Sequence, residues 1–195
     1  MKNVSSRHMS PSGLLARKAF TVFRRACRDE SGVTAIEFAM VAVPFFALIV
    51  GIIEIGLMFF AGRILDNATA DAARLIRTGQ AYTQNFDAAA FRASVMSELP
   101  SFFTNDRLAI DVRTFETFAG INSRPPVEDG KLNNDNFTYV NPGPSQIVVV
   151  RVFYRWPYTG SYMGVNFADL DDGSRLLGAV QAFRTEPFPE RAGGS

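Results

Sequence analysis

FAMVAVPFFALIVGIIEIGLMFF, residues 38–60, is the stretch that decides the architecture of this 195-residue chain, and we call it the apolar run. Glu54 is its only charged residue. As a helix, the apolar run is long enough to cross a hydrocarbon core of about 30 Å. A secretory signal peptide has a shorter apolar stretch, about 7 to 15 residues, and Phe59 disrupts the small-residue cleavage pattern that would end at Ala61. We therefore expect a single membrane span that is not cut on its far side.

The charges around the apolar run predict its orientation. Seven basic residues and no acidic one occupy residues 1–28, whereas the flank just after the run is balanced. Lys and Arg concentrate on the cytoplasmic side of a span. We therefore expect residues 1–32 to form a basic cytoplasmic leader, with the carboxy-terminal two thirds exported.

The composition argues against most enzymes and against nucleic-acid binding. With 20 basic and 19 acidic side chains, the chain is no uniformly basic nucleic-acid binder. Its single cysteine, Cys27, and single histidine, His8, both precede the apolar run, so neither can serve an exported catalytic or zinc site. Asp169, Asp171 and Asp172 form either a polar turn or a set of oxygen ligands for calcium. We expect no catalytic residues, no cofactor and no resident metal.

Glu37 stands at the cytoplasmic edge of the apolar run. A carboxylate near the membrane core costs up to about 2.5 to 3.5 kcal/mol on insertion scales unless a cation compensates it. Small residues recur at spacings of three and four along the same helix, which is either a close-packing face or ordinary use of Ala and Gly in spans. These residues are Ala35, Ala39, Ala42, Ala47 and Gly51.

Residues 32–62, GVTAIEFAMVAVPFFALIVGIIEIGLMFFAG, closely resemble the amino-terminal signature of TadE-like proteins, the minor pilins or pseudopilins of bacterial tight-adherence (Flp-type) pili. The resemblance continues through RILDNATADAARLIRTG, residues 63–79. The matching elements are Gly32, Glu37, Phe38, Pro44 and the Glu54-x-Gly56 pair.

The resemblance implies processing by a prepilin peptidase, which would cut between Gly32 and Val33 on the cytoplasmic side. Residues 33–195 would remain, without the leading cations and without Cys27. It also implies that Glu37 pairs with the amino terminus of a neighbouring subunit, and that Phe38 belongs to the same recognition and assembly motif. The implied partners are the peptidase, other minor pilins and the pilus assembly machinery. The implied location is the bacterial inner membrane, with a periplasmic head and a place in the surface pilus after processing.

Two further residues of the span have predicted roles. Pro44 lacks an N–H group and crowds the preceding turn, so we expect it to kink the helix. Glu54 lies about 26 Å along the helix from Glu37, which places it near the outer boundary if Glu37 is at the inner one. Glu54 then either reaches interfacial water or contacts a partner subunit.

The helix is expected to continue beyond the membrane. Residues 33–62 would be the transmembrane part and residues 63–79 an amphipathic extension, with Gly79 as its stop. One side of this region carries apolar residues at spacings of three and four, which we call the helix seam. The seam would pack against the chain's own head, against other pilin-like helices, or both. It consists of Met58, Ala61, Leu65, Ala68, Ala72 and Leu75.

Residues 80–188, which we call the head, predict an α+β fold with a small antiparallel sheet. A helix is expected over residues 85–99, with Asn85 or Asp87 as its cap, and a long loop over residues 119–145. Residues 189–195 would be a flexible tail. Strands are expected over residues 108–115, 146–156 and 176–185.

The aromatic residues near the strongest strand are either core or a contact surface. They are Phe153, Tyr154, Trp156, Tyr158 and Tyr162. The rival interpretation of the whole chain is an uncleaved single-span anchor whose head is a periplasmic scaffold or binding module. A membrane-tethered hydrolase would need a set of catalytic residues that this sequence does not offer.

Overall fold

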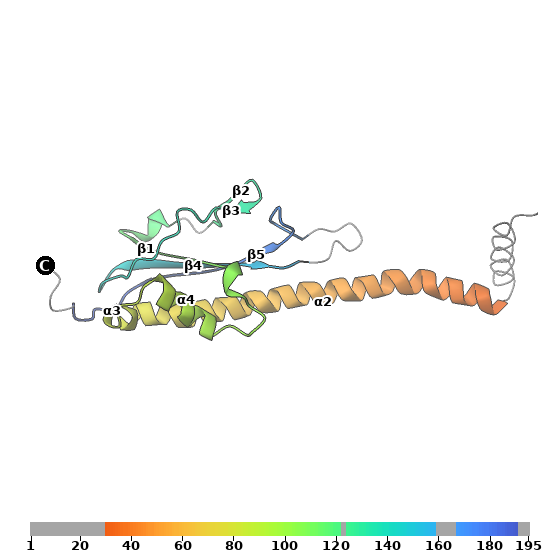
Figure 1. Cartoon of the computed structure of the whole chain (residues 1–195), viewed down its shortest axis with the longest axis horizontal. Helices are drawn as coiled ribbons and strands as arrows, with labels where there is room; N and C mark the ends of the chain where they lie inside the picture. The colour runs from red at the N-terminus through yellow and green to blue at the C-terminus, as the bar shows by residue number, and fades with distance from the viewer. Residues whose placement is uncertain (1–29, 122–123, 159–166, 191–195) are drawn as a thin grey trace, which may run out of the picture. The chain divides into compact units, whose positions relative to one another are not determined.

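A computed structural model describes residues 30–121, 124–158 and 167–190 (Figure 1). Most of the basic leader, Tyr162 and the end of the tail lie outside these residues. The chain forms two units, residues 1–50 and 51–195. The described part of the first unit is helical, and the second contains the whole head.

The long helix α2 spans Glu30–Arg77, close to the expected 33–79. Pro44 lies inside the helix. Arg74 and Arg77 occupy its last turn, where positive side chains stabilise the helix by interacting with its free carbonyl groups. Gly79 ends the helical path with a φ of 76°, a left-handed conformation that glycine adopts without strain. A Cβ on Gly79 would also lie 2.5 Å from the Phe188 ring, so glycine is required here for space as well.

Three antiparallel strands form the sheet of the head in the order β1-β4-β5. β1 is Leu108–Phe115, β4 is Ile147–Trp156 and β5 is Arg175–Arg184. All three expected strands are therefore confirmed to within one residue at each end. The register pairs Asp111 with Arg151 across β1 and β4.

One face of the sheet packs on the helices of the second unit. The alternating residues Val148, Val150, Val152 and Tyr154 of β4 are buried in one core with the α2 residues Ala61, Leu65, Ala68, Ala72 and Ile76. Alanines dominate this side of α2, and their small side chains allow the helix to lie close to the sheet. Met58 and Leu75 are partly buried against the same core. The helix seam thus packs on the chain's own head, and the expected α+β fold with a small antiparallel sheet is confirmed.

The second expected helix, α4, spans Ala88–Ser97. Its cap is Asp87, whose Oδ1 accepts the Ala90 N–H at 2.7 Å. Arg92 extends from α4 to donate to the Leu108 carbonyl at 2.7 Å, which ties the helix to the start of β1. The sequence interpretation missed α3, a single helical turn at Gln80–Thr83.

Residues 119–145 are less irregular than expected. They contain a short hairpin of β2 (Val127–Glu128) and β3 (Lys131–Leu132), joined through Asp129 and Gly130. Both joining residues have positive φ, which is the geometry of a two-residue hairpin turn. Further along, Tyr139 forms a parallel bridge with Val112, so this segment covers the outer edge of β1. The expected long loop therefore contains a two-stranded hairpin and an edge bridge that the sequence did not predict.

The segment after β5 links the residues just before β4 to the carboxy-terminal end of α2. The Thr185 side chain is buried, donates to the Gly143 carbonyl at 2.8 Å and accepts the Gln146 N–H at 2.8 Å. The Glu186 N–H donates to the Arg77 carbonyl at 2.8 Å. The end of β5 is therefore fixed beside the carboxy-terminal end of α2.

Leu65 tests the packing of α2 on the sheet. Because Leu65 is fully buried, Leu65→Ala should lower the free energy of unfolding by about 2 to 5 kcal/mol. Leu57→Ala is the matched control, since Leu57 lies on the same helix and is 53% exposed. It should change that free energy by no more than about 0.5 kcal/mol. Denaturant unfolding in detergent micelles, followed by near-UV circular dichroism, measures both; equal losses would contradict the packing.

Candidate functional site

The residues of the expected signature all lie on α2. Gly32 and Val33 are in its first turn, and Glu37 follows about one turn later with an exposed side chain. Phe38 is also exposed, and Glu54 is partly buried. Pro44 lies inside the helix. The structure thus places these residues along one element, in the order and spacing that the sequence has.

Apolar side chains of this helix are exposed over most of residues 33–60. Among the described residues, α2 is the one helix that is long and apolar enough to cross a membrane. Exposed apolar surfaces of this size mark contacts with membrane or protein. The exposed large apolar residues are Val33, Ile36, Phe38, Met40, Val41, Val43, Phe45, Phe46, Leu48, Ile49, Val50, Ile52, Ile53, Leu57, Phe59 and Phe60.

The small residues of α2 leave open space beside the helix. A Cβ added to Gly51 or to Gly56 would meet no atom within 4 Å. Ala35 and Ala39 are exposed. Each of these glycines therefore leaves room beside the helix, and close helix packing stays a prediction.

The head contains a buried ionic network that the sequence interpretation missed. Asp111 is fully buried on the sheet face that points away from α2. Its Oδ2 accepts the Arg151 Nε–H at 2.9 Å, and its Oδ1 accepts the Arg113 Nε–H at 2.8 Å. The same Oδ1 accepts the Thr138 N–H at 2.9 Å. The network therefore joins β1, β4 and the segment that covers the edge of β1.

The electrostatic balance keeps Asp111 ionised. Burial alone raises its pKa, but hydrogen bonds from Thr138, Arg113 and Arg151, with the charge of Arg151, outweigh that effect and lower the pKa below its usual value. A lowered folded-state pKa contributes stability that is present above the unfolded pKa, about 3.9. That contribution is lost as the pH falls through the folded pKa, so the network stabilises the head at neutral pH and weakens only in acid.

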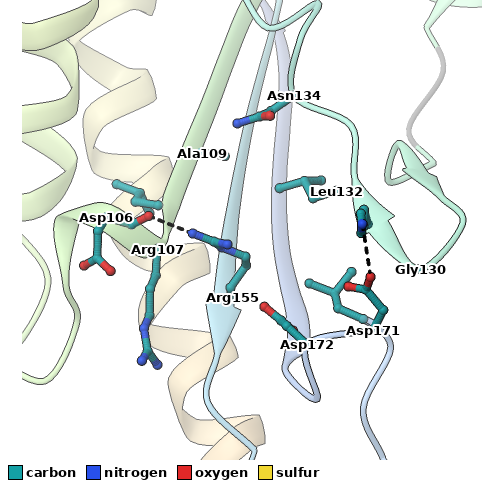
Figure 2. A pocket seen from close by; sticks show the side chains of 12 residues that line it. Asp106, Arg107, Ala109, Gly130, Leu132, Asn134, Arg155, Asp171 and Asp172 are labelled. Carbon is teal, nitrogen blue, oxygen red and sulfur yellow. Dashed lines mark hydrogen bonds and ion pairs between the residues drawn. The ribbon is translucent and has the colours of Figure 1, made fainter.

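A cavity of about 360 Å³ opens at one end of the sheet (Figure 2). Figure 2 shows Arg155 reaching toward Asp106, whose carbonyl accepts from the guanidinium at 3.0 Å. Lys131 pairs with Asp171 at 3.5 Å. One pair of charged groups that line the cavity is thus already an ion pair, and Arg155 is held by a backbone carbonyl.

The aspartates of residues 169–172 also have partners. Asp169 pairs with Arg175 at 2.9 Å, and Asp172 accepts the Ser174 N–H at 2.9 Å. Hydrogen bonds from the Ser174 hydroxyl and then its N–H lower the pKa of Asp172. Within the described ranges, no three His, Cys, Asp or Glu side chains are grouped to hold a metal ion. These contacts are those of a polar turn.

Tyr139 is the other titratable group with a displaced pKa in the head core. Burial, and to a lesser degree the charge of Asp87, raises its pKa to about 12. Its hydroxyl has no hydrogen-bond partner among the residues that the structure describes. Its ring lies 5.5 Å from that of Phe91. Tyr139 therefore remains a neutral phenol near pH 7, and it packs against α4.

The fold and the exposed helix together define the class: an amino-terminal apolar helix of membrane or export type that carries a small α+β head. Residues 32–74 match the family model of the TadE-like protein, so this segment of the chain is similar to the TadE-like family. This pilin-type family is generally non-enzymatic. No curated protein and no solved structure was found to match. The matched segment contains most of α2 and ends before the head begins.

Asp111 provides the test of the buried network. Asp111→Asn should lower the free energy of unfolding by about 3 to 5 kcal/mol at neutral pH, because it leaves the Arg151 cation buried without its carboxylate. The control is Asp66→Asn, which removes an exposed pair with Arg63 and should cost no more than about 1 kcal/mol. Unfolding by denaturant at pH 7 compares them. Similar losses for the two variants would show that the network is not structural.

Proposed function

We propose that this chain is a TadE-like minor pilin or pseudopilin. It inserts into the bacterial inner membrane with its amino terminus in the cytoplasm and its head in the periplasm. A prepilin peptidase cuts it between Gly32 and Val33, and it then acts in the assembly of a tight-adherence type IV pilus. The observation that carries this proposal is the coincidence of the TadE-like segment, residues 32–74, with a helix whose apolar half is exposed.

The exposed half of α2 supports the proposal because its apolar side chains need to be buried, first in the lipid bilayer and later against other subunits. Each fully buried Val, Leu, Ile, Met or Phe side chain contributes about 1.5 to 3 kcal/mol relative to water. Lipid provides that burial while the subunit is in the membrane. A subunit that leaves the bilayer for a filament must exchange lipid for protein, and the apolar helices of other pilin-like subunits are the matching surface.

Glu37 gives the cut a physical consequence. Cleavage would remove the basic leader and create a new ammonium group at Val33, about 6 Å along the helix from Glu37. A carboxylate in an apolar surface is costly unless a cation compensates it. The amino terminus of a neighbouring subunit would supply that cation, so processing and assembly would be linked through this residue.

Gly32→Leu tests the cut site. A bulky side chain next to the cleaved bond should abolish maturation, so that the full-length chain accumulates in cells with an active prepilin peptidase. Gly51→Leu is the matched control, because a Cβ at Gly51 meets no atom within 4 Å and the cut site is unchanged. It should be processed as efficiently as the natural chain. Immunoblot mobility distinguishes the two forms; normal processing of Gly32→Leu would favour the uncleaved anchor.

Glu37→Ala tests assembly separately from insertion. It should leave insertion and cleavage intact but lower incorporation into sheared filaments by roughly two to three orders of magnitude, since an unpaired buried ammonium costs about 3 to 5 kcal/mol. Glu37→Asp keeps the carboxylate and should retain part of the incorporation. Quantitative blots of filament and membrane fractions give both values. Unaltered incorporation of the alanine variant would count against the pairing role.

A further inference from the structure

Exposure along α2 changes abruptly where the head begins to cover the helix. Phe59 is 74% exposed and Phe60 is 58% exposed, whereas Ala61 is fully buried. All three belong to the second unit. The head therefore covers one side of α2 from about Met58, at the end of the apolar run, because Met58 is partly buried against the head core.

The sheet has a defined orientation along this part of α2. β5 ends beside Arg77, because the Glu186 N–H donates to the Arg77 carbonyl. β4 is antiparallel to β5, so the opposite end of the sheet carries Trp156, which pairs with Arg175. Figure 1 shows the strands running alongside α2 from its end toward its earlier residues.

The length of β4 places Trp156 near the end of the apolar run. A strand of 10 residues spans about 30 Å, which equals about 20 residues of helix. Counting back from Arg77, this end of the sheet reaches the level of about residue 57, close to Phe60. Trp156 therefore lies near the point where the exposed apolar surface of α2 gives way to the covered one.

Three aromatic residues gather at this end of the sheet, and we call Phe102, Phe103 and Trp156 the aromatic end. The Phe102 ring lies 5.0 Å from that of Phe103 and 6.2 Å from that of Trp156. Phe102 is nevertheless 50% exposed, and Trp156 is only partly buried. Arg155, whose side chain donates to the Asp106 carbonyl, adds a cation at the same end of the sheet, on the other face of β4. Aromatic rings next to polar groups are typical of the membrane–water interface.

We propose that the aromatic end lies in the headgroup region of the periplasmic leaflet, with phospholipid as its occupant, while the subunit resides in the membrane. This inference rests on the proposed function, because it requires the apolar run to be in the bilayer. Lipid is favoured over a protein partner because insertion of the run brings headgroups to the level of Phe60 without a second association step. Contact at this end would hold the head in one orientation on the membrane before assembly.

The single tryptophan of the chain makes the proposal measurable. The full-length protein is reconstituted into vesicles of phosphatidylethanolamine and phosphatidylglycerol that contain a lipid with a quencher at the headgroup. Trp156 fluorescence should shift to the blue relative to unfolded protein, and the headgroup quencher should remove most of it. A quencher at the end of the acyl chain should have a much smaller effect.

Two relocated tryptophans serve as matched controls. Trp156→Phe with Phe118→Trp moves the probe past the other end of β1, where Phe118 is 54% exposed, and its quenching should be several times weaker. Trp156→Phe with Phe59→Trp moves it to the exposed side of α2, where lipid quenchers should act strongly if the run is inserted.

The outcomes separate the two proposals. Strong lipid quenching at position 59 with quenching at 156 no greater than at 118 would overturn the aromatic end as a lipid contact and leave the span intact. Absence of lipid quenching at all three positions would overturn the span, and with it the proposed function and this inference. Strong quenching at 59 and 156, with weak quenching at 118, is the expected result.

Discussion

The packing of one side of α2 against the sheet is the contact on which the rest of the structure depends. From Ala61 on, the helix buries a side rich in alanine under the alternating face of β4. Before Ala61, the same helix leaves most of its large apolar side chains exposed, and Met58 is partly buried against the head core. One continuous element thus has a part that belongs to the head and a part that needs partners from outside the chain. This division fits a protein that resides in a membrane and then joins an assembly of similar helices.

The head has two stabilising devices, of which the first fastens it to α2 and the second ties its own strands together. The segment around Thr185 and Glu186 fastens the end of β5 to the end of α2. On the opposite face, Asp111 collects hydrogen bonds from two strands and from the segment along the edge of β1. Both devices act through side chains or backbone groups far apart in sequence, so they form only when the sheet has its final register.

Much of the fold could be predicted because its periodicities are strong. Alternation in β4 identified the buried face, and spacings of three and four along α2 identified the buried side from Ala61 to Leu75. The Asp129–Gly130 pair is a typical hairpin signal, but strands of two residues are too short to show alternation. Asp111 was missed because its pairing with Arg151 depends on the register between two strands, which the sequence of either strand does not contain. The residues of the α2 signature could be found because they lie together along one apolar segment that resembles a known family signature.

The most direct test of this account is the identity of the first residue of the natural chain in its membrane. Amino-terminal sequencing and intact mass would be compared in cells with and without an active prepilin peptidase. The account predicts a chain that begins at Val33 only when the peptidase is active, and at the original start when it is absent. A chain that still carries the basic leader under both conditions would contradict processing and would leave Glu37 without the ammonium partner proposed for it.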